Sequence, residues 1–210
     1  HSIFQDIEGL TQNMLKVTTF LKGVCKIEEH MQSMEIIPTM HDKHFIKDDK
    51  GQYWRVLSFI ENSQSYDCVE NAEMAYKGGK AYGWFTKVLS DFKTEELIEI
   101  LPDFHNAEFR IGQFEEAVRE DAVGRLETVQ AWVDELLSRK NEMMILHHLQ
   151  EEGRIPTRAT HNDTKINNLL FSKVGNPKSV VDLDTLMPGL VHFDFGDAIR
   201  TFCNSADEDE

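Results

Sequence analysis

The chain has 210 residues, 40% of them hydrophobic and 28% charged, which is an ordinary globular composition and excludes extended disorder. Its formal net charge of −15 argues against a general nucleic-acid-binding protein, because neutralising phosphates needs clustered Lys and Arg. No apolar run approaches the roughly 18 residues of a membrane span, and we expect neither a membrane span nor a signal peptide. Cys25, Cys68 and Cys203 are odd in number and far apart, so we expect free thiols in a cytoplasmic protein.

The first sixty residues predict one helix followed by a small antiparallel meander. Apolar residues recur at helical spacing over residues 7–21. Three strand-like segments follow, with a turn at 48–51 before the last of them: 34–38, 44–47 and 52–60. A polar stretch from residue 61 then marks the boundary between two parts of the chain.

Helical patterns dominate the middle of the chain. A long helix is predicted for 72–92, with Gly78-Gly79 as a weak or closely packed point. Further helices are predicted at 94–101, ended by Pro102, and as two or three segments within 113–149. The pattern of the last fifty residues predicts two short strands, at 169–171 and 179–183, and a final helix at 192–202. The pattern as a whole indicates an α+β protein with two lobes.

The most informative residues surround these two strands. Asn168 directly precedes the first strand, and Asp182 lies near the end of the second. If the strands pair as a hairpin, Asn168 and Asp182 come together. Carboxylate and amide oxygens are hard ligands that, with phosphate oxygens and waters, can complete the octahedral shell of Mg²⁺. We therefore expect a magnesium site at this hairpin.

The loop before the hairpin carries three further candidates. Asp163 lies upstream of the metal ligands, where it can accept a proton from an attacking hydroxyl group. Lys165 can meet negative charge on a transferred phosphoryl group, and we expect His161 to fix the loop through a hydrogen bond. This division of labour is the one expected for phosphoryl transfer.

The order and spacing of these residues resemble a known motif. His161, Asp163 and Asn168 match the H-x-D-x-x-x-x-N pattern of kinase catalytic loops, and Asp182 resembles the later metal-binding aspartate. Leu183-Asp184 replaces the Phe-Gly of protein kinases, as in small-molecule kinases. The strings HNDTKINNLLF, VDLDTLMPGLVHFDFGDAIR and WRVLSFIENSQSYD look like the N-acetylhexosamine 1-kinase branch of the aminoglycoside phosphotransferase and choline kinase superfamily. The resemblance covers nearly the whole chain.

The resemblance implies a protein-kinase-like fold, with a partial N-lobe at 1–60 and a mostly helical C-lobe at 61–210 that carries a catalytic β-hairpin. It implies transfer of the γ-phosphoryl group of ATP to a small-molecule hydroxyl, most simply the anomeric hydroxyl of an N-acetylhexosamine. Two alternatives stay open: a kinase for aminoglycosides, choline or homoserine, and a non-catalytic binding protein with a kinase fold. The expected partner is a small molecule, with neither nucleic acid nor membrane, and the oligomeric state is left open.

By the same resemblance, Asp163 is the catalytic base, assisted by Lys165, and Asn168 and Asp182 hold Mg²⁺. Backbone groups near Phe59 and Ile60 would hold the adenine of ATP.

Other polar residues have two interpretations each. Asp184 would support the metal or the substrate. A cluster after Pro102 would line the sugar pocket or form an ordinary capped loop: His105, Asn106 and Arg110. A second set would brace the catalytic loop from the last helix, or form a helix cap and an exposed charge pair: Asp194, Asp197 and Arg200. The tryptophans are expected in the core: Trp54, Trp84 and Trp132.

Two features of complete relatives have no counterpart in the sequence, namely the loop that covers the phosphates and the lysine that binds them. The GGKAYG string at 78–83 does not match G-x-x-x-x-G-K-[ST] and lies in a helical pattern. We therefore expect a fragment of a longer protein that keeps the metal-binding hairpin but is inactive as a kinase by itself.

Overall fold

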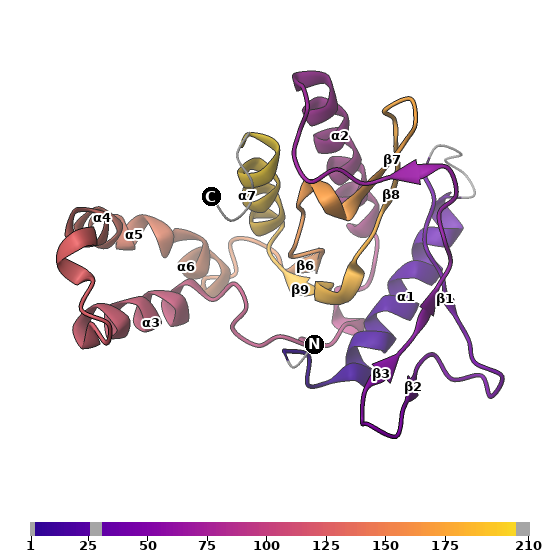
Figure 1. The fold of residues 1–210 in the computed structure, drawn as a ribbon, viewed down its shortest axis with the longest axis horizontal. Helices are drawn as coiled ribbons and strands as arrows, with labels where there is room; N and C mark the ends of the chain where they lie inside the picture. The colour runs from indigo at the N-terminus through magenta and orange to yellow at the C-terminus, as the bar shows by residue number, and fades with distance from the viewer. Residues whose placement is uncertain (1–2, 26–30, 205–210) are drawn as a thin grey trace. The chain divides into compact units, whose positions relative to one another are not determined.

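The computed structural model describes residues 3–25 and 31–204 (Figure 1). The chain divides into two compact units, one formed by residues 1–100 with 157–210 and the other by residues 101–156. The second unit is therefore an insertion between two parts of the first. The described residues form helices and small antiparallel sheets, which is the mixed class that the sequence predicts. The expected boundary between lobes near residue 61 stays a prediction.

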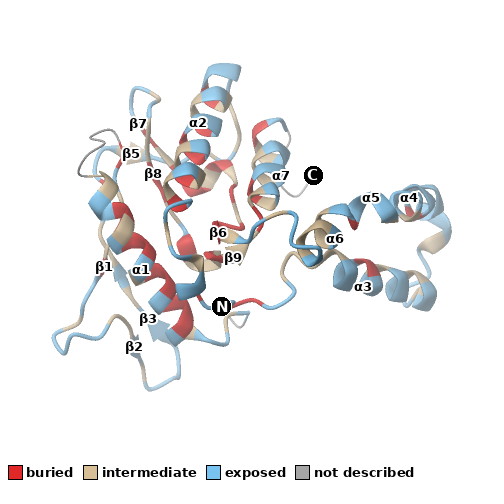
Figure 2. Cartoon of the chain, turned by 180° about the vertical axis from the view of Figure 1, so that it is seen from behind, coloured by how far each residue is buried: buried red, intermediate tan, exposed pale blue. Residues whose placement is uncertain are grey.

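Three long helices belong to the first unit: α1 (Ile7–Cys25), α2 (Ala72–Leu89) and α7 (Val191–Phe202). Each was predicted, because its apolar residues recur at helical spacing. A buried face runs along α1, formed by Leu10, Met14, Val17 and Leu21 (Figure 2). The side chain of Asn71 caps α2 by accepting a hydrogen bond from the Met74 backbone N–H (2.9 Å). No helix within the described ranges is both long and apolar enough to cross a membrane.

The strands before residue 60 form two nested antiparallel pairs. The inner pair joins β2 (Ile46–Lys47) to β3 (Tyr53–Trp54), and the outer pair joins β1 (Ile36–Ile37) to β4 (Val56–Leu57). Asp48 closes the inner turn, where its side chain accepts hydrogen bonds from two backbone N–H groups two and four residues later. The predicted strands are present, but each is only two residues long.

Two further sheets lie in the first unit. In one, β7 (Leu169–Ser172) pairs with β8 (Pro177–Val180) on one side and with β5 (Ser63–Gln64) on the other (Figure 1). In the other, β6 (Arg158–Thr160) pairs with β9 (Met187–Gly189). The sequence predicted the pairing of β7 with β8. It did not predict β5, β6 or β9.

A buried polar junction in the first unit is centred on Asn13. The Asn13 side chain of α1 donates hydrogen bonds to the carbonyl oxygens of Ile98 (2.7 Å) and Leu186 (3.0 Å) and accepts one from the Ile98 N–H (2.9 Å). It thereby joins three segments that are far apart in the sequence. The fully buried apolar side chains of this unit include Phe85, Phe171, Ile166, Leu169, Leu183, Leu186 and Leu190.

Helices α2 and α7 approach closely at Gly78. A methyl group added there would lie 2.1 Å from Cε1 of Phe202, whereas a methyl group at Gly79 would meet no described atom within 4 Å. Gly78 is thus the closely packed one of the two glycines in the predicted pair.

The second unit consists of helices: α3 (Ala107–Glu120), α4 (Leu126–Ser138), α5 (Lys140–Met143) and α6 (Ile145–Glu151). Lys140 pairs with Glu115 (2.6 Å), and His147 lies 3.5 Å from both Glu108 and Glu151. Its buried apolar residues are Leu101, Ile111, Val133 and Met144. The predicted segment 113–149 therefore holds helices as expected, although α3 begins earlier.

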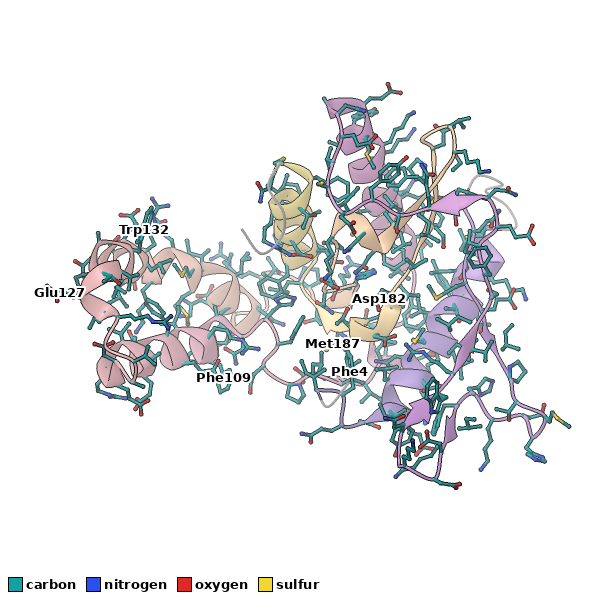
Figure 3. All side chains as sticks on the ribbon, in the orientation of Figure 1. Phe4, Phe109, Glu127, Trp132, Asp182 and Met187 are labelled. Atoms are coloured by element: carbon teal, nitrogen blue, oxygen red, sulfur yellow. The ribbon has the colours of Figure 1, made fainter. Side chains whose placement is uncertain are left out.

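Two predictions about local structure are wrong. The predicted helix at 94–101 is a single 3-10 turn, Thr94–Glu96, because the backbone of Ile98 bonds to the Asn13 side chain and not to a helical partner. Two of the tryptophans that we expected in the core are exposed, Trp54 at 57% and Trp132 at 73% (Figure 3). Trp54 lies at the rim of a two-residue strand, where its indole N–H donates to the Asp48 carboxylate (2.8 Å).

Candidate active site

The loop between β6 and β7 is held by the side chain of Asp194, which is buried in α7. Its two carboxylate oxygens accept hydrogen bonds from the backbone N–H groups of His161 (3.0 Å) and Asn162 (2.7 Å). Asn162 has a φ of 66°, in the left-handed region that Asn tolerates better than most residues. Hydrogen bonds to a buried carboxylate are strong, so α7 fixes the course of this loop.

Asp197 also lies near the loop, and Arg200 pairs with it. The Thr164 hydroxyl donates to the Asp194 backbone carbonyl (2.5 Å) and lies 3.4 Å from an oxygen of Asp197. Arg200 pairs with Asp197 across one turn of α7 (2.8 Å). Of the two interpretations, bracing is confirmed for Asp194. Asp197 and Arg200 form the charge pair of the alternative, with one weak contact to the loop.

His161 ties the loop to the strand that precedes Asp182. Its Nε2 lies 2.9 Å from the carbonyl oxygen of Val181, and this contact requires a proton on Nε2 because a carbonyl can only accept. The ring is fully buried, edge-on to Tyr82 and Phe85. The predicted role of His161 in fixing the loop is confirmed.

Asp163, Lys165 and Asn168 form a group around one carboxylate. Nδ2 of Asn168 donates to the backbone carbonyl of Asp163 and to its side-chain Oδ2, each at 2.9 Å. The Lys165 ammonium group lies 3.6 Å from the same Oδ2. The Asp163 side chain is 26% exposed, so it is oriented by its neighbours and still reachable from solvent. These contacts arise locally, because the three residues lie within one loop.

Asp182 is placed beside Asn168 by the β7–β8 pairing. Leu169 pairs with Val180, and the Val181 N–H donates to the Asn168 carbonyl (2.9 Å). Asp182 follows directly, with a left-handed φ of 57°. The backbone therefore brings together the two residues that the sequence predicted as metal ligands.

The electrostatic environment of Asp182 suits a cation. Burial and the negative charge of Asp184 raise the pKa of its carboxyl, with a smaller contribution from Asp163, while His161 and Lys165 oppose the shift. A divalent cation would offset this accumulation of negative charge.

The donor set also suits Mg²⁺. The hydrogen bonds of the Asn168 side chain both use Nδ2, so its Oδ1 can serve as a ligand. Across the described residues, no cluster of three or more His, Cys, Asp or Glu side chains is suited to a metal ion. Mg²⁺ does not need such a cluster, because one or two carboxylates with substrate phosphates and waters suffice. Asn168 and Asp182 therefore fit a magnesium ion.

Asp184 forms an ion pair with Arg55, from the segment between β3 and β4. Each side chain is 23% exposed, so the pair is largely shielded from solvent. The pair ties the small sheets near the start of the chain to the turn that follows Asp182. No local sequence pattern marks Arg55, because its partner lies 129 residues away. A role of Asp184 toward metal or substrate stays a prediction.

Phe59 and Ile60, the predicted adenine-binding positions, differ in burial. Phe59 is 82% exposed, whereas Ile60 is buried and its carbonyl oxygen accepts a hydrogen bond from the Ser63 hydroxyl. Their predicted role depends on backbone groups and stays a prediction.

The three residues after Pro102 belong to the second unit. Asn106 caps α3 by accepting from the Phe109 N–H (3.1 Å), and Arg110 donates to the Phe104 carbonyl (3.2 Å). The ring of His105 packs against Phe104 with centroids 4.6 Å apart. These contacts are those of a capped loop, which was one of the two interpretations. A part of these residues in binding a substrate stays a prediction.

The phosphotransferase enzyme family (APH) matches residues 29–210 of the chain. The match spans most of the sequence and includes the whole loop, the hairpin and α7. The chain belongs to this family. Phosphotransferase membership indicates a kinase-type enzyme that acts on small molecules, and it agrees with the mixed fold and small antiparallel sheets.

Proposed function

We propose that this protein transfers the γ-phosphoryl group of ATP to a hydroxyl group of an N-acetylhexosamine, at the anomeric position. The observation that carries the proposal is the arrangement around Asp163, whose carboxylate contacts Asn168 and Lys165 beside the turn that holds Asp182. In phosphoryl transfer, positioning and neutralisation of charge supply most of the catalysis. The loop and hairpin supply a base, Asp163, and a cationic side chain, Lys165. They also supply two oxygen ligands for a metal ion, Asn168 and Asp182.

Each residue has one task in this proposal. Asp163 accepts the proton of the attacking hydroxyl, for which its partial exposure leaves room. Lys165 stabilises charge on the transferred group. Asn168 and Asp182 would hold Mg²⁺, which when bound neutralises charge on the phosphates.

Two further parts of the chain have a role in this proposal. The backbone near Phe59 and Ile60 would hold the adenine of ATP. Asp194 acts through the loop, since its carboxylate fixes the backbone that presents Asp163.

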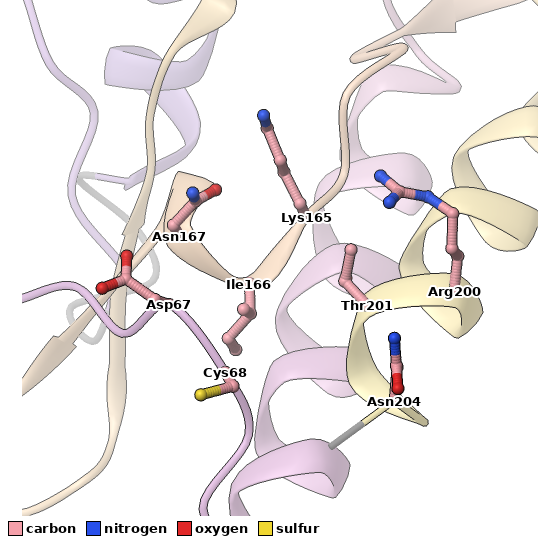
Figure 4. Close-up of a pocket in the computed structure, with 8 residues that line it drawn as sticks. All are labelled: Asp67, Cys68, Lys165, Ile166, Asn167, Arg200, Thr201 and Asn204. Atoms are coloured by element: carbon pink, nitrogen blue, oxygen red, sulfur yellow. The ribbon is translucent and has the colours of Figure 1, made fainter. Parts of the chain in front are cut away.

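The small pocket beside the loop has no excess of acidic side chains, which favours a neutral acceptor there over a cationic one. It is lined by the cations Lys165 and Arg200 and by one acid, Asp67 (Figure 4). A pocket for choline or an aminoglycoside would instead need an excess of acidic side chains. A sugar carries no charge and offers many hydrogen-bonding groups.

The test is an acceptor screen with the full-length gene product, ATP and Mg²⁺. The acceptors are N-acetylglucosamine, N-acetylgalactosamine, choline, homoserine and an aminoglycoside. We expect phosphorylation of an N-acetylhexosamine and a loss of about 10²–10⁴-fold in kcat for Asp163→Asn, the range for removal of a general base.

Each other outcome changes a different part of the proposal. Preference for choline or an aminoglycoside keeps the chemistry and removes the sugar acceptor. An active Asp163→Asn variant removes the assignment of the base. Nucleotide binding without any phosphorylated acceptor supports the non-catalytic alternative.

A further inference from the structure

Tyr82 of α2 is a buried tyrosine whose hydroxyl reaches the loop between β6 and β7. Its ring packs edge-to-face against the rings of His161 in the loop and Phe202 in α7, with centroids 6.0 Å apart in each pair. These contacts fix the direction of the ring, and the hydroxyl donates a hydrogen bond to the backbone carbonyl of Lys165 (2.9 Å). A helix that begins at residue 72 is thus attached to the loop that carries Asp163.

The Lys165 carbonyl oxygen has a second donor. The Asn168 N–H bonds to it (3.1 Å) and closes the 3-10 turn Ile166–Asn168. A carbonyl oxygen has two lone pairs, so it can accept both hydrogen bonds at once. The peptide group that follows Lys165 is therefore held by two partners, one in its own turn and one in α2.

The protonation state of Tyr82 suits a donor. Burial raises the pKa of its hydroxyl well above the usual value for tyrosine, and the negative charges of Asp194 and Asp163 add to the shift. The hydroxyl therefore keeps its proton throughout the neutral pH range. The Lys165 carbonyl can only accept, so the two groups match.

This anchor acts on the side chain of Lys165. The Lys165 ammonium group lies 3.6 Å from Oδ2 of Asp163, and the lysine side chain is 25% exposed. A lysine side chain is flexible, so the direction in which it leaves the backbone limits where its charge can lie. Misplacing a group by about 1 Å at a reacting centre can cost about 10²-fold in rate.

We propose that Tyr82 is a positioning residue for phosphoryl transfer, because its hydroxyl fixes the backbone of Lys165 and thereby holds the ammonium group beside the Asp163 carboxylate. The inference rests on the proposed function, in which Lys165 stabilises charge on the transferred group. It does not depend on which acceptor receives that group. The competing interpretation is that Tyr82 serves the packing of the core alone.

The experiment is a double-mutant cycle between Tyr82 and Lys165 in the full-length gene product. Tyr82→Phe removes the hydroxyl and keeps the ring, and the Lys165 carbonyl keeps the Asn168 N–H as a partner, so the fold should tolerate the change. The same change is made in Lys165→Ala, which keeps the carbonyl and removes the ammonium group. The matched control is Tyr76→Phe, at a tyrosine of α2 that is 72% exposed.

For every variant, kcat and KM are measured with ATP and with the acceptor that wild type prefers, and thermal unfolding checks the fold. We expect Tyr82→Phe to lower kcat about tenfold, the effect of one hydrogen bond, and to leave both KM values unchanged. In the Lys165→Ala background it should lower kcat no more than about twofold, because the charge that Tyr82 positions is absent. Tyr76→Phe should leave kcat unchanged.

A second measurement does not need catalysis. In Tyr82→Phe, the backbone amides of residues 164–169 should exchange with deuterium faster than in wild type, because the carbonyl that closes their turn has lost one of its two donors. Exchange in α1 should stay as in wild type, and so should exchange of residues 164–169 in Tyr76→Phe.

The inference is overturned if Tyr82→Phe lowers kcat by the same factor with and without the Lys165 side chain, the result that a role in packing alone predicts. It is also overturned if Tyr82→Phe leaves either kcat or the exchange of residues 164–169 unchanged. In these cases an active wild type leaves the proposed function standing. A wild-type protein that phosphorylates none of the acceptors in the screen removes the proposed function, and the inference with it.

Discussion

Asp182 is held where both its backbone and its charge oppose folding. Its left-handed φ of 57° costs on the order of 1 kcal/mol for a residue other than Gly. Burial and Asp184 raise the pKa of its carboxyl, which means that the folded chain disfavours the ionised form. Strain and unfavourable charge of this kind cluster at functional sites, where a ligand offsets them.

The Asp182→Asn variant should therefore be more stable than wild type at pH 7 without Mg²⁺. Folding raises the pKa of this carboxyl above its value in the unfolded chain. As the pH rises through the range between the two pKa values, the carboxyl lowers the stability of the fold, and the loss persists at every higher pH. The gain in Tm should vanish at low pH, where Asp182 is protonated in both states. Asn keeps the shape and tolerates the left-handed backbone.

The measurement is thermal unfolding of both proteins between pH 4 and pH 8, with and without Mg²⁺. Mg²⁺ should raise the Tm of wild type and leave that of the variant unchanged. A variant less stable than wild type at pH 7, or one equally stabilised by Mg²⁺, would contradict this account.

At the scale of single residues, the sequence predicted contacts that arise within one loop or hairpin. The spacing of Asp163 and Asn168 was enough, because the chain between them is short. The Arg55–Asp184 pair was missed, since no local pattern links residues 129 positions apart. The hydrogen bond from Tyr82 to Lys165 was missed too, because the two residues lie 83 positions apart.

At the scale of elements, the contact between α2 and α7 depends on the absence of a side chain at Gly78. Its neighbour Gly79 lies on the same helix and faces open space. The two glycines thus form a natural pair for comparing packing with helix propensity.

Gly78→Ala should lower the free energy of unfolding by about 1–3 kcal/mol, because the new methyl group meets the ring of Phe202. Gly79→Ala should raise it by up to about 1 kcal/mol, the difference in helix propensity between the two residues. Urea denaturation of both variants measures the effects. Adding Phe202→Leu to Gly78→Ala should recover part of the loss, and shifts of the same sign for both glycines would refute the packing account.

Elements with many residues on one face were predicted well, and short ones were not. The three long helices follow from apolar spacing over several turns. Strands β5, β6 and β9 have two or three residues each, too few for an alternating pattern, and β6 and β9 pair across nearly thirty residues of sequence. The 94–101 segment has helical composition, but tertiary contacts to Asn13 decide its backbone.

At the scale of the whole molecule, the two units differ in how much apolar surface they bury. The second unit buries Leu101, Ile111, Val133 and Met144, and it exposes a stripe on α4 formed by Val129, Trp132 and Leu136. A unit of 56 residues with so few buried side chains has little to oppose local opening.

Backbone amides of α3 and α4 should therefore exchange with solvent faster than those of α2, which carries fully buried residues such as Phe85 and Leu89. Hydrogen–deuterium exchange followed by mass spectrometry measures this, with α2 as the internal reference. Equal protection of α3, α4 and α2 would show that the second unit is as stable as the first.

The Asn13 junction also imposes an order on the events of synthesis. Asn13 leaves the ribosome 85 residues before its partner Ile98 and 173 residues before its partner Leu186. During that interval the nascent chain holds an amide whose buried partners do not yet exist, while the contiguous residues 101–156 are already complete. The first unit can complete this junction only after Leu186 has been made. If synthesis stops before residue 186, the partial chain can form neither the core of this unit nor the turn after Asp184.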